Sequence, residues 1–116
     1  MEDYVLVINA NDNDAETIDD LLAQENLSFG TAGVGTASQL SQKLLLGQAG
    51  VSYRDVPMDG GGPTLTALLG SQVDAATVQL AEAGPYLEDG TFTPLVTFGE
   101  ERSEFLPDVP TATEEG

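Results

Sequence analysis

Apolar runs that favour β-structure alternate along this 116-residue chain with segments of helical periodicity, and this alternation limits the possible folds more than any other feature. We expect strands at Tyr4–Ile8, Leu27–Gly30, Val51–Pro57, Val73–Gln79 and Thr93–Phe98. We expect helices from Asn13 or Asp14 to about Gln24, from Thr36 to Leu46, from Pro63 to Leu69 and from Ala81 to Asp89, the last one short or broken at Gly84 and Pro85. The pattern predicts parallel β-α-β units, and so a single α/β domain over residues 1–116 with three layers, a mostly parallel five-stranded sheet and helices on both faces.

The spacing of leucine and isoleucine predicts the buried face of each helix, and glycine and proline predict where helices begin and end. Three buried sets are expected: Ile18, Leu21 and Leu22; Leu40, Leu44 and Leu45; Leu65, Leu68 and Leu69. Gly47 and Gly50 should end the second helix and Gly70 the third, which Pro63 should open. The tail after Gly99 is expected to be extended or rich in turns, with at most one helical turn.

Two glycine-rich turns lead from a predicted strand into a predicted helix. The first runs from Gly30 to Thr36 and the second from Met58 to Pro63. Glycine lets the backbone bring N–H groups close to a ligand, and the first turn of a helix attracts anions. Both turns follow the carboxyl ends of strands, where open α/β sheets bind ligands, so the pair predicts an anion site at one edge of the sheet. A capped turn without a ligand is the alternative that remains open.

Two nucleotide-binding motifs do not fit the first turn. A P-loop requires a lysine after its last glycine, and Thr36 follows Gly35 directly. A dinucleotide-binding motif beginning at Gly33 would require a third glycine where Ser38 stands. The turn therefore predicts anion binding without a nucleotide.

Composition excludes several functional classes. The chain has no Cys and no His, which removes disulfides, thiolate metal sites, cysteine nucleophiles and Ser-His-Asp triads. The chain has 20 acidic residues and only three basic ones, Lys43, Arg54 and Arg102, so its formal net charge is -17. This negative charge disfavours nucleic-acid binding. We interpret the acidic surface as adaptation to high salt and expect KCl to stabilise the fold. Thermal melts at low and molar KCl test this expectation.

No segment predicts a membrane span, a signal peptide or a cofactor. The sequence contains no apolar run of about 18 residues and no charged leader followed by an apolar stretch. Asn9, Asn11, Asn13 and Asp20 have part of a calcium-loop spacing, but Asp14 stands where that loop needs glycine. We expect a helix-capping turn there and no metal.

The order of several blocks along the chain resembles a known family. These blocks are YVLVINANDNDAETIDDLLA, LSFGTAGVGTASQL, YRDVPMDGGGPTLTALLGSQVDAATVQ, GPYLEDGTFTPLV and FLPDVPTATEEG. Together they resemble the substrate receptors of tripartite tricarboxylate transporters, the TctC or Bug family, over nearly the whole chain. The resemblance implies one lobe of a type II periplasmic-binding-protein fold, here the second lobe, with the first lobe absent. Tyr4–Ile8 and Thr93–Phe98 would be the segments that cross between the lobes.

The resemblance also implies ligand-binding positions. Small hydroxyls and backbone N–H groups of the first turn would bind a carboxylate, with Ala32 and Gln39 standing where serine and histidine are frequent. Met58 and Asp59 replace an aromatic and a basic residue, and Val78 and Gln79 replace an Asp-Asn pair, which argues against binding an amine through that pair. The implied ligand-binding set is Thr31, Ala32, Gly33, Gly35, Thr36, Gln39, Gly60, Gly61, Val78 and Gln79.

The leading functional hypothesis is a receptor, not an enzyme, that captures a small organic carboxylate and presents it to membrane permease subunits. The full-length parent would work outside the cytoplasm. The effector domain of a transcription regulator with the same fold is an alternative, which would need a DNA-binding segment elsewhere. Catalysis by Asp55, Asp59 or Asp74 is a third possibility, disfavoured because acidic residues among 20 are mostly solvated.

Overall fold

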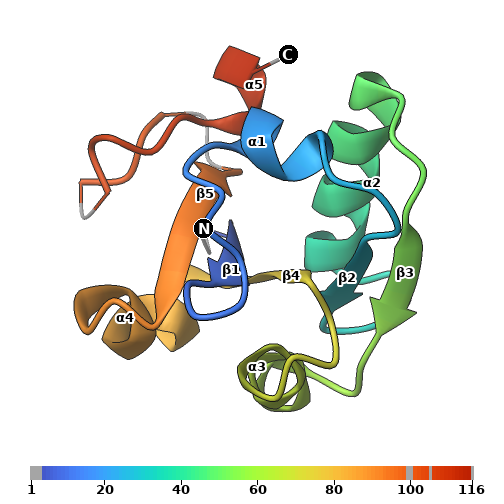
Figure 1. The fold of residues 1–116 in the computed structure, drawn as a ribbon, viewed down its shortest axis with the longest axis horizontal. Coiled ribbons are helices and arrows are strands. Elements are labelled where there is room, and N and C mark those ends of the chain that lie inside the picture. Colours follow the sequence, from blue (N-terminus) through green and yellow to red (C-terminus); the bar gives the residue numbers. More distant parts are fainter. Residues whose placement is uncertain (1–3, 99–100, 105, 116) are drawn as a thin grey trace.

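The computed structural model describes residues 4–98, 101–104 and 106–115. It contains a five-stranded sheet covered by helices (Figure 1). The elements are β1 (Tyr4–Asn9), α1 (Ile18–Leu22), β2 (Ser28–Thr31), α2 (Ala37–Ala49), β3 (Arg54–Pro57), α3 (Gly61–Leu69), β4 (Ala75–Gln79), α4 (Leu80–Glu88), β5 (Phe92–Thr97) and α5 (Ala112–Glu115). The α/β fold with a five-stranded sheet is confirmed.

The strand order is β3-β2-β4-β1-β5, and the sheet is mixed. β2 is parallel to β3 and β4, whereas β1 is antiparallel to both of its neighbours, β4 and β5. β1 therefore runs against the other four strands, a reversal that alternation of strands and helices alone could not indicate. Tyr4 pairs with Gln79, and the Phe98 N–H donates to the Tyr4 carbonyl over 3.0 Å. β1 thus begins beside the ends of β4 and β5.

Each face of the sheet has its own apolar core. One core joins alternate sheet residues such as Leu6 and Phe29 to α1 and α2, and the other joins Val7 and Val78 to α3 and α4. Figure 1 shows the two pairs of helices on opposite sides of the sheet. The prediction of three layers, with helices packed on both faces of the sheet, is confirmed.

The first helix is shorter than predicted and begins later. Its N-cap is Thr17, whose hydroxyl accepts from the Asp20 N–H over 3.1 Å, while the Asp20 carboxylate accepts from the Thr17 N–H, so that the two form a capping box. Asn13 instead accepts from the Ala15 N–H and exchanges hydrogen bonds with the Gln24 side chain. The prediction of a cap at Asn13 or Asp14 is therefore wrong.

The buried face of α2 that was predicted from the spacing of its leucines is wrong in part. Leu40 and Leu44 are 55% and 67% exposed, whereas Ser38, Gln39 and Gln42 are buried together with Leu45. The first half of the helix lies over polar groups of the sheet, and Gln42 accepts a hydrogen bond from the Thr77 hydroxyl over 2.9 Å. Polar side chains that find buried partners can displace leucine from the inner face.

Smaller differences from the prediction concern the ends of α2 and α3, the buried face of α3 and the proline in α4. Gly47 lies inside α2, which ends at Gly50 in the left-handed conformation with φ 70°. Pro63 is the third residue of α3, where its missing N–H is still without an acceptor within the helix. Gly70 ends α3 as predicted, but Leu69 is 40% exposed and Thr64 and Ala67 are buried instead. α4 continues through Pro85.

Candidate functional site at the ends of β2 and β3

The two glycine turns lie side by side at one edge of the sheet. Thr31 and Pro57 are partners in the parallel register of β2 and β3. The Met58 N–H donates to the Thr31 carbonyl and the Gly60 N–H to the Ala32 carbonyl, each over 2.8 Å. The predicted common edge is therefore present, and backbone hydrogen bonds hold one turn against the other.

The first turn uses several of its backbone donors internally. The Ala32 N–H donates to the Ser38 hydroxyl over 3.2 Å, the Gly35 N–H to the Gln39 side-chain oxygen over 2.8 Å, and the Thr36 N–H to the Gly33 carbonyl over 3.3 Å. Within the described ranges, the N–H groups of Gly33 and Val34 have no hydrogen-bond partner. Val34 is 79% exposed, so this tip faces solvent.

Thr36 is the N-cap of α2 and also closes the turn. Its hydroxyl accepts from the Gln39 N–H over 3.4 Å and donates to the Gly33 carbonyl over 2.7 Å. Thr31 is fully buried, and its hydroxyl has no hydrogen-bond partner among the described residues. Because Thr31 lies two residues after Phe29 on β2, its side chain shares the α2 face of the sheet.

Gln39 connects the first turn to β3. Its side-chain oxygen accepts from the Gly35 N–H, and its amide nitrogen donates to the Asp55 carboxylate over 2.8 Å. The other Asp55 oxygen is buried and has no partner in the described part of the chain. Burial, and secondarily the Asp55 charge, raises the pKa of the Tyr53 hydroxyl.

Sequence reasoning missed Ser38 and Asp55 as supports of this turn. The spacing of Thr36 and Gln39 fits the capping-box pattern, Ser or Thr followed three residues later by Glu or Gln, and it could have drawn attention to the Gln39 side chain. Here that side chain reaches the Gly35 N–H, one residue before the cap.

Gly33 is required where it stands. Its φ is 150°, and a Cβ there would lie 3.0 Å from the Met58 carbonyl oxygen in the second turn. A side chain at this position would therefore force the two turns apart. Gly35, with φ 79°, faces open space, since a Cβ at that position would have no described atom within 4 Å.

The second turn is fixed by the backbone and by one threonine. Gly60, with φ 111°, is the N-cap of α3, and no side-chain cap is present among the described residues. The buried Thr64 hydroxyl lies 2.8 Å from the Gly60 carbonyl and 3.0 Å from the Thr31 carbonyl, within hydrogen-bonding reach of both. Thr64 thereby joins α3 to the end of β2.

Two of the predicted ligand-binding residues, Val78 and Gln79, lie at the end of β4. Val78 is 2% exposed and packs in the core shared with α3 and α4, so its side chain does not reach the edge. Gln79 is half-buried at the end of β4 and precedes α4. Glu82, in the first turn of α4, was not predicted, but its carboxylate lies against Gly61.

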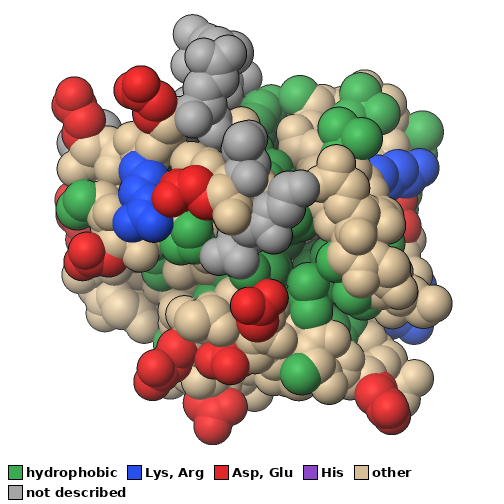
Figure 2. All heavy atoms as spheres, turned by 90° about the horizontal axis from the view of Figure 1, so that it is seen from above, with side chains coloured by type: hydrophobic (Ala, Val, Ile, Leu, Met, Phe, Trp, Pro, Cys, Tyr) green, Lys and Arg blue, Asp and Glu red, His purple; other side chains and the backbone are tan. Residues whose placement is uncertain are grey.

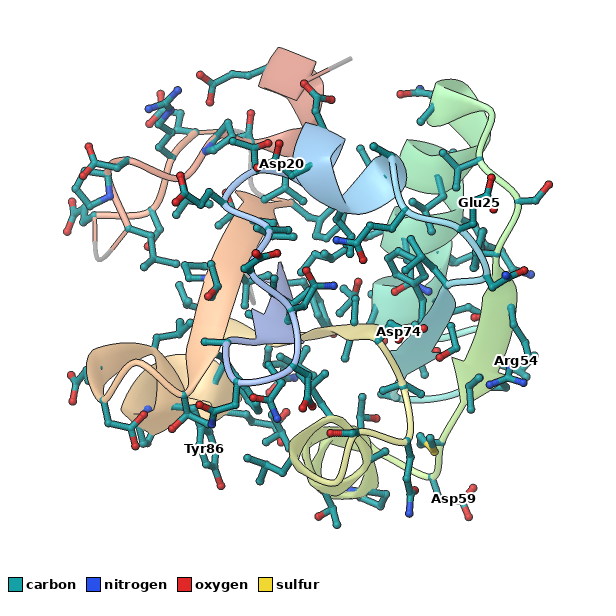
Figure 3. The ribbon with its side chains drawn as sticks, viewed as in Figure 1. Asp20, Glu25, Arg54, Asp59, Asp74 and Tyr86 are labelled. Atoms are coloured by element: carbon teal, nitrogen blue, oxygen red, sulfur yellow. The ribbon has the colours of Figure 1, made fainter. Side chains whose placement is uncertain are left out.

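The three acidic residues considered for catalysis are not gathered together. Asp74 accepts from the Ser28 N–H over 2.7 Å and from the Ser28 hydroxyl at the start of β2, the end remote from the glycine turns. Asp59 is exposed on the segment between β3 and α3, and Figure 3 shows Asp59 and Asp74 apart. Among the described residues no group of three acidic side chains could hold a metal ion.

The surface of the molecule is acidic at several separate places, as Figure 2 shows for one face. Arg54 extends outward from β3 (Figure 3) and lines a groove of about 870 Å3 together with Tyr53, at the start of β3 rather than at the glycine turns. No described helix is long and apolar enough to cross a membrane.

Solved structures share this fold. A TctC solute-binding protein from Polaromonas superposes with a TM-score of 0.90 at 27% identity, covering 98% of this chain and 40% of that protein. MatC from Rhodopseudomonas palustris, solved with bound malate, is 31% identical with a TM-score of 0.84, covering 99% of this chain and 41% of MatC. Another R. palustris protein, solved with adipate, has a TM-score of 0.90 at 27% identity, covering 99% of this chain and 40% of that protein.

Sequence relatives agree with the structures. The chain is 34% identical over 116 residues to a UPF0065 protein of Cupriavidus necator, covering all of this chain and 32% of the relative. It thus spans about a third of the length of such relatives. These structural neighbours are solute-binding proteins, not enzymes, and the fold of this chain is consistent with one lobe of a periplasmic binding protein. The family model of the tripartite tricarboxylate transporter family receptor (TctC) matches residues 1–116, and the chain belongs to this family.

Proposed function

We propose that this chain is one lobe, the second, of a two-lobed receptor and that its glycine turns bind a carboxylate of a small organic acid. The observation that carries the proposal is the pairing of the two turns at one edge, with the N–H groups of Gly33 and Val34 left without partners in the described ranges. Two adjacent N–H groups in an exposed tip can donate to one carboxylate.

A carboxylate can bind here although the formal net charge is -17. Donors in contact with the ligand act at about 3 Å, whereas most acidic side chains are farther away and are screened by salt. A hydrogen bond to a charged group contributes about 1.5 to 3 kcal/mol. The bracing of the turn by Ser38 and Gln39 reduces the ordering that binding requires.

The other lobe would close over this edge. β1 begins and β5 ends beside each other, with Tyr4 paired to Gln79 at the end of β4, so both connecting segments would approach the edge that carries the turns. In the full-length parent, this receptor would work outside the cytoplasm and deliver its ligand to membrane permease subunits. Malate and adipate, seen in two related structures, indicate the size of acid to examine first.

A thermal-shift screen in molar KCl tests the proposal. Lactate, malate and adipate would be added to the chain and to its Gly33→Val and Gly47→Ala variants. We expect at least one acid to raise the melting temperature of the wild-type chain and of Gly47→Ala, which alters an exposed helix position with open space around it in the described structure. Gly33→Val should lose the response. An equal response of Gly33→Val would contradict the site.

A further inference from the structure

The Glu82 carboxylate fits into a space that exists because residue 61 is glycine. A Cβ at Gly61 would overlap both carboxylate oxygens and the carboxyl carbon of Glu82. The backbone at Gly61 is helical, without the positive φ that requires glycine elsewhere in this turn. At the next residue, Gly62, a Cβ would meet no described atom within 4 Å. The missing side chain at position 61 therefore accommodates the Glu82 carboxylate.

Glu82 lies between the beginnings of two helices. It belongs to the first turn of α4 and contacts the first residue of α3. Both helix beginnings carry partial positive charge that attracts a carboxylate. Within residues 4–98, 101–104 and 106–115, Glu82 has no hydrogen bond or ion pair, and it is half-buried. The partial positive charge at the beginning of α4 would by itself explain an acidic residue at position 82. It would not explain why the Glu82 carboxylate occupies the space that a side chain at Gly61 would fill.

The position of Glu82 relative to the first turn follows from the strand order. β2 lies between β3 and β4, so the turn after β2 lies between the beginning of α3 and the beginning of α4. The Gly60 N–H binds the Ala32 carbonyl, which joins the first turn to the residue next to Gly61. The unpartnered N–H groups of Gly33 and Val34 and the Glu82 carboxylate thus belong to the same edge.

We infer that Glu82 determines which carboxylates this edge accepts. The inference rests on the proposed function and narrows it: one carboxylate of the ligand binds the first turn, and the ligand group that faces Glu82 is a hydrogen-bond donor, preferably an ammonium. A second carboxylate at that end would meet the negative charge of Glu82. The ligand class is therefore a monocarboxylate with an amino group.

A matched pair of ligands tests the inference. Glutarate and 4-aminobutyrate have the same three methylene groups and one common carboxylate, and they differ in having a carboxylate or an ammonium at the other end. Each would be titrated into the 15N-labelled chain while the amide signals of Gly33 and Val34 are followed by NMR, which also detects millimolar affinities. The variants are Glu82→Gln and Gly61→Ala, with Gly62→Ala as control.

Gly61→Ala keeps the charge of the chain but displaces the Glu82 carboxylate, and Gly62→Ala makes the same change where there is room. We expect the wild-type chain and Gly62→Ala to prefer 4-aminobutyrate about tenfold or more, the effect of one hydrogen bond to a charged group. Glu82→Gln and Gly61→Ala should reduce the preference to about twofold or less, because each removes the carboxylate from that place.

The outcomes separate the two proposals. If both ligands shift the Gly33 and Val34 signals with equal affinity in the wild-type chain and in Glu82→Gln, Glu82 does not select the ligand and the carboxylate site stands. If neither ligand shifts these signals in any variant, the carboxylate site itself is wrong and the inference falls with it. Titration with inorganic phosphate provides a check without an organic ligand: the amide of residue 61 should respond more strongly in Glu82→Gln than in the wild-type chain.

Discussion

The two glycine turns look alike in the sequence but are held in different ways. The turn from Gly30 to Thr36 is braced by side chains of α2, because Ser38 and Gln39 accept hydrogen bonds from its backbone and Thr36 caps the helix. The turn before α3 has no side-chain cap in the described structure and is held by backbone contacts with the first turn and by Thr64. Polar bracing fixes the geometry of the first turn, whereas the second turn depends on the first.

Gly33→Val should have the largest effect, because it strains both turns at once. Valine is disfavoured at φ 150°, and its Cβ would press on the Met58 carbonyl oxygen. We expect a loss of about 1 to 3 kcal/mol in the free energy of unfolding, measured by urea denaturation in molar KCl. Gly35→Ala, with positive φ but open space around it among the described residues, should lose less. Equal losses would show that the contact between the turns does not matter.

Gln39→Ala tests the bracing of the first turn. The change leaves the Gly35 N–H without its acceptor and removes the donor to Asp55, so we expect the free energy of unfolding to fall by about 1 to 3 kcal/mol. Gln48→Ala, on the exposed part of the same helix, is the matched control and should change stability by less than about 0.5 kcal/mol. If the two variants unfold at the same urea concentration, the side chain of Gln39 does not brace the turn.

Thr36→Ala removes the cap of α2 and should cost about 1 kcal/mol. Thr36→Ser retains the hydroxyl and should preserve most of the stability. Hydrogen exchange of the α2 amides provides a local readout, since loss of the cap should increase exchange in the first turn of α2 more than in α3. Faster exchange in α3 alone would mean that the cap supports the second turn rather than the first.

The smallest expected effect on stability is that of Glu114, in the segment after β5. Glu114 lies outside both turns and so provides a reference for the variants in the turns. Hydrogen bonds from the Arg102 side chain and then from the Thr111 N–H lower the pKa of Glu114 to about 2. This pKa is below the ordinary value of 4.5, so the contribution to stability is complete above pH 4.5 and is lost as the pH falls from 4.5 towards 2. Because the pair is exposed, Glu114→Gln should change stability only slightly at pH 7. A difference from the wild-type chain that grows as the pH falls would contradict the assignment.

The sequence predicted the common edge of the two turns because this edge depends on local features. Apolar runs set the strands, glycines mark the turns, and parallel pairing of β2 with β3 brings their ends together. The reversed direction of β1 escaped prediction, since pairing with β4 and β5 depends on contacts between residues far apart in the chain.

The side chains that support the site were harder to predict because burial of polar groups depends on partners from other elements. Leucine spacing favoured Leu40 and Leu44 as the inner face of α2, but Gln39 and Gln42 find partners on β3 and β4 and occupy that face. Glu82 and Gly61 lie on different helices, and their spacing in the sequence does not reveal their contact. The local sequence therefore predicts the position of a turn, whereas the side chains that stabilise the turn are determined by packing between elements that are distant in the sequence.

Mapping of the bound acid on the amide spectrum tests the central claim most directly. The 15N-labelled chain would be titrated in molar KCl with whichever of lactate, malate and adipate raises its melting temperature most. We predict that the largest shifts occur at Gly33 and Val34, two backbone donors at the tip of the first turn that have no partner in the described ranges. The largest shifts at Tyr53 and Arg54, in the groove at the other end of β3, would contradict carboxylate binding by the turns.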